Sequence, residues 1–164
     1  MNPTTNPAEH PRVQTLIACF HHADAAMRDL PLYNAKVPIE AIDFRPFGET
    51  TLLGVVQTPW FMNLVMLPVE PEPMDMTGIG KSCIIELPAG PRTFIVGGDE
   101  VVGLYKAHSL HSPVLNFTLP GQAQAEARRL LALLMTPPSG EPTAAKKEER
   151  GFNRRALLLG PRRS

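Results

Sequence analysis

The apolar stretch at residues 52–67, LLGVVQTPWFMNLVML, constrains the fold more than any other feature of the chain. Its sixteen residues are too few for an ordinary membrane-spanning helix, and Gln57, Pro59 and Asn63 interrupt it. Short apolar runs that are rich in β-branched and aromatic residues, with a proline between them, are typical of strands. We therefore expect two strands of a buried hairpin, around which the rest of the domain is organised.

Length and cysteine content indicate a one-domain protein of a reduced compartment. The 164 residues are enough to bury a core without disulfide or metal. Cys19 and Cys83 are the only cysteines and form no CxxC pair. The N-terminal residues have neither the basic nor the apolar region of a signal peptide. We expect a cytoplasmic protein without stable membrane insertion.

Charge is divided unevenly along the chain although the formal net charge is zero. Residues 1–140 carry nine basic and thirteen acidic groups, a net charge of −4, whereas residues 141–164 carry seven basic and three acidic groups. This pattern serves solubility, or it marks an acidic body that accepts basic segments, its own tail among them. An acidic body does not favour binding to nucleic acid.

Periodicity and turn residues predict the order of the elements. The cap signature at residues 6–9 precedes an amphipathic helix, and Pro11 shifts its expected start to residue 10 or 11. The core stripe of this helix includes Leu16 and Phe20, and it ends before Pro31. Strands are expected at 42–45, 51–57, 60–67, 82–87, 93–96 and 101–110, and a second helix at 121–135.

These elements predict an α+β fold, in which an antiparallel β-sheet of five to six strands is covered by an N-terminal and a C-terminal helix. A flexible basic C-terminal tail follows. We divide the chain into a single domain (1–136), a flexible linker (137–150) and a basic apolar C-terminal segment (151–164).

No set of residues indicates catalysis or metal binding. His108 and His111 are separated by an odd number of positions on an expected strand, which predicts that their rings point to opposite faces. Cys19 lies beside the apolar face of its helix and is interpreted as a packed thiol. We expect no enzyme, no catalytic residue, no metal and no cofactor. The alternative is a small redox or metal-delivery factor that acts through Cys19, Cys83, His108 and His111.

Trp60, Phe61 and Met62 are consecutive in the second strand of the expected hairpin. Neighbouring strand residues point to opposite faces, so all three are buried only if both faces are covered. If one face is partly open, either Phe61 or the pair Trp60 and Met62 lines an apolar groove. Methionines of the acidic loop at 68–80 are then expected to cap it. The predicted partner-binding residues are Pro59, Trp60, Phe61, Met62, Met74 and Met76.

The C-terminal segment contains a motif that resembles a twin-arginine export leader, with two arginines followed by apolar residues. Near the C-terminus it cannot direct export, and the simpler interpretation is a basic, mildly apolar tail. The motif residues are Arg154, Arg155, Leu157 and Leu158.

Four segments of the chain, taken in order, carry a resemblance to a known family. They are Thr58-Pro59-Trp60 with the apolar strand to Pro68; Glu86-Leu87-Pro88-Ala89-Gly90 with Thr93-Phe94-Ile95-Val96-Gly97; Ser109-Leu110 with Ser112-Pro113; and Arg154-Arg155-Ala156-Leu157-Leu158-Leu159-Gly160. In their order and spacing these segments resemble the HybE/HupJ family of [NiFe]-hydrogenase assembly chaperones, and the likeness covers about residues 11–163.

The resemblance implies a cytoplasmic accessory protein in the maturation of an uptake hydrogenase. Its implied partner is the hydrogenase small subunit precursor, which carries a twin-arginine leader and iron–sulfur clusters; the large subunit is a second candidate. The family implies no catalytic residues. On this basis we form the hypothesis that residues 153–160 mimic the leader and occupy the client groove until the client displaces them.

Overall fold

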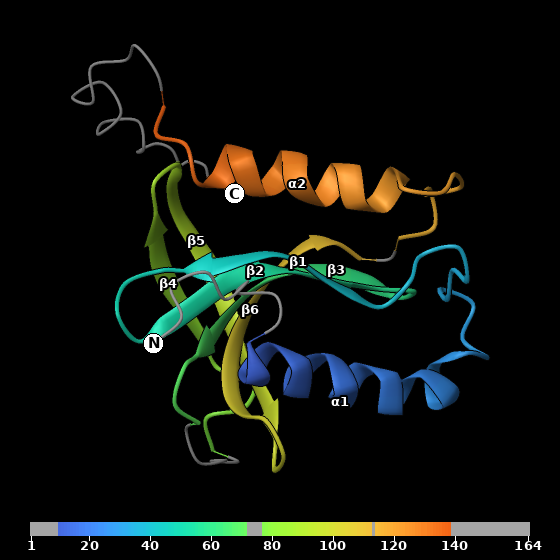
Figure 1. Cartoon of the computed structure of the whole chain (residues 1–164), viewed down its shortest axis with the longest axis horizontal. Helices are drawn as coiled ribbons and strands as arrows, with labels where there is room; N and C mark the ends of the chain where they lie inside the picture. The colour runs from blue at the N-terminus through green and yellow to red at the C-terminus, as the bar shows by residue number, and fades with distance from the viewer. Residues whose placement is uncertain (1–9, 72–76, 113, 139–164) are drawn as a thin grey trace.

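The computed structural model describes residues 10–71, 77–112 and 114–138 (Figure 1). Within them the chain forms an α+β fold with a six-stranded sheet and two helices, as predicted. The elements are α1 (Pro11–Met27), β1 (Glu40–Pro46), β2 (Thr51–Thr58), β3 (Phe61–Pro68), β4 (Ser82–Leu87), β5 (Gly90–Asp99), β6 (Gly103–His111) and α2 (Gln122–Leu134).

The expected central hairpin is confirmed as β2 and β3, which pair without interruption from Thr51 opposite Pro68 to Thr58 opposite Phe61. All neighbours in the sheet are antiparallel, in the order β1-β2-β3-β6-β5-β4. The edges of the sheet are therefore β1 and β4.

Helices α1 and α2 lie on opposite faces of the sheet (Figure 1). The α2 face holds one core, with Met62, Leu64 and Leu131 fully buried in it. The α1 face holds a second core, with Leu16, Val56 and Val65. Because β2 lies between these cores, nearly all of its residues are buried. This double coverage explains why apolar residues of the central stretch point to both faces of the sheet.

Helix α1 begins at Pro11, where the side chain of His10 accepts a hydrogen bond from the Arg12 backbone N–H at 3.1 Å. The cap signature at 6–9 lies outside the described residues, and the shifted start is confirmed. Leu16 is buried as expected. Phe20 was expected in the core, but it is only partly buried, because it contacts Phe61 at the side of α1 where a hollow opens over the sheet.

The β5–β6 turn lies later than the sequence indicates. Strand β5 continues to Asp99, and the expected turn at 97–100 moves to residues 100–102. The Asp99 carboxylate accepts hydrogen bonds from the backbone N–H groups of Val101 and Val102 at 2.9 and 2.8 Å. Gly98 has φ +147 and lies against the backbone of Gly103, where a Cβ has no room.

The two histidines of β6 lie on the same face, so the prediction of opposite faces is wrong. The β3–β6 register shifts between Met62 and Asn63, which places His108 opposite Leu64 and His111 opposite Met62. Leu64 and Met62 both belong to the core under α2. A bulge inserts one extra residue into one strand, so two side chains that are three positions apart can point to the same face of the sheet.

Candidate partner-binding groove

The α1 face of the sheet is only half covered. Helix α1 packs over the β1–β2–β3 side, and the β6–β5–β4 side is left open. Ile95 of β5 and Ile84 of edge strand β4 point to this open side and are 45% and 62% exposed. Large apolar side chains exposed together on one surface indicate an interaction site.

A hollow of about 260 Å³ lies where α1 meets this open half. Its walls are mainly apolar and include Phe20 from α1, Phe61 from β3, Ile95 from β5, and Tyr105 and Ala107 from β6; Asn63 and Ser109 add two polar side chains. We call this hollow, together with the adjoining exposed Ile84, the sheet groove. It has the apolar lining typical of sites that accept hydrophobic side chains.

Phe61 lines the groove and is the one residue to do so among the four predicted partner-binding residues that the structure describes. Its ring meets Phe20 edge to face, with ring centres 5.3 Å apart. A second edge contact joins it to Trp60 at 6.0 Å, and Trp60 in turn stacks on Tyr33 at 6.2 Å. Aromatic contacts on two sides hold the Phe61 ring as a fixed wall.

The other predicted partner-binding residues that the structure describes do not line the groove. Pro59, Trp60 and Met62 are buried, Trp60 in the β2–β3 turn and Met62 in the core under α2. Met74 and Met76 lie outside the described residues, as do the tail residues Arg154, Arg155, Leu157 and Leu158. Of the two alternatives drawn from the sequence, Phe61 or the pair Trp60 and Met62, it is therefore Phe61 that faces the groove.

Asp99 places a negative charge at the turn end of the groove. The backbone N–H of Val102 holds the pKa of Asp99 below its ordinary value, with smaller contributions from the Cys19 thiol and the Val101 N–H. Asp99 does not line the groove itself; with Cys19 it lines a neighbouring hollow of about 430 Å³. Asp99 is thus ionised at neutral pH beside an apolar surface.

The described part of β4, β5 and β6 presents no lysine or arginine on this face. Lys106 lies opposite Met66 and Arg92 opposite Ile85, and these two partners pack against the core on the other side of the sheet. Glu86, two positions after Ile84, shares the groove side. The open half-face therefore combines apolar and acidic groups, which suits a segment that is apolar and basic.

Tyr105 and Cys19 are both uncharged at neutral pH. Burial raises the pKa of Tyr105 to about 12, with Asp99 adding to the effect. Burial and the hydrogen bond to Asp99 raise the pKa of Cys19 to about 11. Because a thiol reacts as its thiolate, Cys19 is poorly suited to act as a nucleophile or to shuttle electrons.

The four residues of the redox or metal-delivery alternative are not brought together. Cys19 packs in the core on the α1 side, whereas Cys83 packs against the core under α2. His108 Nδ1 lies 2.9 Å from the Thr93 carbonyl oxygen, and its ring faces Phe94. Within the described ranges no three His, Cys, Asp or Glu side chains are grouped to hold a metal ion.

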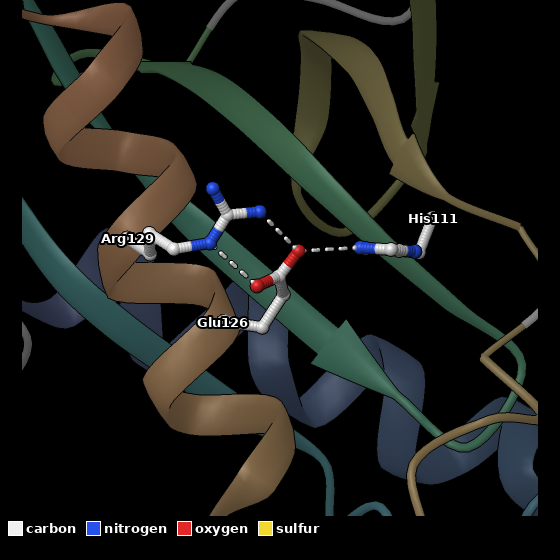
Figure 2. A network of polar contacts seen from close by, with 3 residues as sticks. All are labelled: His111, Glu126 and Arg129. Atoms are coloured by element: carbon white, nitrogen blue, oxygen red, sulfur yellow. Dashed lines mark hydrogen bonds and ion pairs between the residues drawn. The ribbon is translucent and has the colours of Figure 1, made fainter.

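His111 takes part in a polar network that joins β6 to α2 (Figure 2). Its Nε2 lies 3.0 Å from Glu126 Oε2, and Arg129 donates to both oxygens of Glu126 at 2.8 Å. These hydrogen bonds hold the pKa of Glu126 at about 2, Arg129 contributing more than His111. The network is consistent with a structural role for His111.

Sequence reasoning did not identify Phe20, Ile95, Tyr105 or Ala107 as groove residues, nor Asp99 as the charge in the neighbouring hollow. The available signal was the apolar Ile95 at an outward position of β5, but its exposure depends on where α1 lies.

None of the helices in the described part of the chain is long and apolar enough to cross a membrane. The fold and its half-open face define the class of the molecule, a small α+β protein with an exposed apolar and acidic groove.

Comparison with known proteins identifies the family. The profile of the family described as "[NiFe]-hydrogenase assembly, chaperone, HybE" matches residues 11–160. The hydrogenase expression/formation protein HupJ of Bradyrhizobium diazoefficiens is 37% identical over 139 residues, which cover 84% of this chain and 80% of HupJ. The hydrogenase-2 operon protein HybE of Escherichia coli K12 is 32% identical over 157 residues, covering 93% and 90%.

The fold is also that of a solved relative. The solution structure of HybE from Escherichia coli matches with a TM-score of 0.60 and 26% identity, covering 100% of this chain and 98% of that one. The chain therefore belongs to the HybE family of [NiFe]-hydrogenase assembly chaperones. Its role lies in hydrogenase maturation, as the resemblance implied.

Proposed function

We propose that this chaperone acts in the cytoplasm and holds the small subunit precursor of a [NiFe] uptake hydrogenase before export, by binding its twin-arginine leader in the sheet groove. A leader of this kind consists of an arginine pair followed by apolar residues. The observation that carries the proposal is the half-open sheet face, on which exposed Ile84 and Ile95 lie beside Asp99 and Glu86 without a lysine or arginine on the described strands β4, β5 and β6.

The groove supports reversible binding of modest affinity. Burial of one large aliphatic side chain contributes about 1.5–3 kcal/mol, and part of this is lost to the entropy of association. Two such side chains and one or two ion pairs with exposed carboxylates contribute at most about 8 kcal/mol before that loss, so the expected affinity is weaker than micromolar. An assembly chaperone must release its client, so weak and reversible capture fits the role.

The direct test is titration of the full chain with a synthetic twin-arginine leader peptide, followed by amide chemical shifts. We expect shifts clustered on Phe61, Ile95, Ala107 and the Asp99 turn. Ile95→Arg places a cation in the groove and is expected to weaken binding about tenfold or more.

The matched control is Leu133→Arg, because Leu133 is 55% exposed on α2 at the opposite face of the sheet. It introduces the same charge at a similarly exposed apolar position and is expected to leave peptide affinity unchanged. Equal effects of the two substitutions on peptide affinity, or amide shifts confined to the α2 face, would show that the leader does not bind in the sheet groove.

A further inference from the structure

We propose that residues 153–160 of the chain itself occupy the sheet groove when no client is bound, and that the client leader must displace them. The proposal rests on the groove assigned above and adds a regulatory occupant to it. The occupant is a segment of the same chain with the sequence Asn-Arg-Arg-Ala-Leu-Leu-Leu-Gly.

The chemistry of this segment matches that of the groove. Arg154 and Arg155 provide two adjacent cations, and Leu157 and Leu158 follow as large apolar side chains. The groove offers exposed Ile95 along its apolar wall, and ionised Asp99 in the neighbouring hollow supplies a negative charge close to Tyr105 of the groove. A segment that satisfies the same requirements as a leader competes for the same surface.

The chain can reach the groove from its last described residue. The carbonyl of Leu134 at the end of α2 accepts a hydrogen bond from Ala89 N–H at 3.0 Å, so α2 ends beside the β4–β5 turn (Figure 1). The tail thus departs next to edge strand β4, which carries Ile84. Residues 139–152 span up to roughly 45 Å when extended. The radius of gyration of a domain of this size is about 15 Å, so the segment can pass around the sheet edge.

A tethered segment competes effectively even if its intrinsic affinity is low. A short flexible tether gives an effective concentration of roughly 1 mM. A segment with an intrinsic Kd of about 0.1 mM would then weaken the apparent affinity for the client about tenfold. The tail would thereby cover exposed apolar surface when the chaperone is idle and be displaced by a client that binds more tightly.

The test compares two full-length variants that change the same charge in the same tail. Arg154→Glu with Arg155→Glu alters the motif, and Arg162→Glu with Arg163→Glu alters the end of the chain outside it. In the absence of peptide we expect the first variant, and not the second, to shift the amides of Phe61, Ile95 and Ala107. We also expect the first variant to bind the leader peptide about five- to tenfold more tightly than the second.

The outcomes separate this proposal from the proposed function. Identical groove spectra and identical peptide affinities in the two variants would overturn the tail proposal and leave leader binding intact. Groove shifts in the first variant without any peptide binding would support the tail and overturn leader recognition. Differences that appear only as protein concentration rises would assign the segment to a second copy and overturn the intramolecular contact.

Discussion

At the scale of single residues, Thr58 shows how one buried hydroxyl positions the groove wall. Thr58 is fully buried, and its Oγ1 accepts hydrogen bonds from the backbone N–H groups of Trp60 and Phe61 at 3.2 and 3.1 Å. These bonds close the β2–β3 turn directly before Phe61. A side-chain oxygen that satisfies buried turn amides is a common use of threonine.

Thr58→Val is expected to lower the free energy of unfolding by about 1–3 kcal/mol, since it leaves the turn amides without an acceptor while keeping the shape of the side chain. Urea unfolding followed by far-UV circular dichroism measures the loss. Thr58→Ser retains the hydroxyl and is expected to lose less. Equal losses in both variants would assign the effect to packing alone.

At the scale of elements, α2 is attached to the sheet by a buried apolar face and by a network of polar contacts. Ala127 and Leu131 are buried against the sheet. On α2, Glu126 contacts His111 at the end of β6 and Arg129 one turn further along the same helix (Figure 2). Because the pKa of Glu126 is lowered from 4.5 to about 2, its ionised form is favoured by folding. That contribution is complete above about pH 4.5 and is lost as pH falls from about 4.5 to 2.

Glu126→Gln is therefore expected to lower the free energy of unfolding by about 0.5–1 kcal/mol at pH 7, a modest value because the Arg129 side chain is 59% exposed. The difference from the unsubstituted protein is expected to shrink toward zero as pH falls to 2. Urea unfolding at several pH values measures it. Glu100→Gln, in the exposed β5–β6 turn, is the control. A difference at Glu126 that does not change with pH would show that the ionised Glu126 carboxylate does not stabilise the attachment of α2.

At the scale of the whole molecule, the distribution of charge favours encounter with a basic client. Residues 1–140 carry a net charge of −4, and the open half-face shows carboxylates on the described strands. A field of one sign increases the rate of encounter with an oppositely charged peptide, and salt screens it. Apolar contacts in the groove are much less sensitive to salt.

Leader-peptide affinity is accordingly expected to fall about three- to tenfold when NaCl is raised from 50 to 500 mM, mainly through a slower association rate. Stopped-flow fluorescence with a labelled peptide separates the two rate constants. Asp99→Asn keeps an acceptor for the turn amides but removes the charge, and is expected to make the salt dependence shallower. A salt-independent affinity would show that the groove reads only the apolar part of the leader.

Local pattern predicted most of the elements but only part of the groove. The hairpin around Pro59, the strands and both helices follow from short-range periodicity, proline positions and turn residues, because these act on the backbone directly. The fold class followed from their order. The pattern also identified Phe61, as one of two alternatives whose choice depended on which face is open.

Tertiary structure alone decided which side chains face the solvent. Phe20 and Ile95 become groove walls because α1 covers only half of a wide sheet, and no local pattern encodes how far a helix extends over strands distant in sequence. The bulge between β3 and β6 turned His111 toward α2, since register depends on pairing between strands far apart in the chain. The sequence by itself determined the elements and the chemistry available to them, whereas the packing of α1 against the sheet determined where that chemistry is exposed.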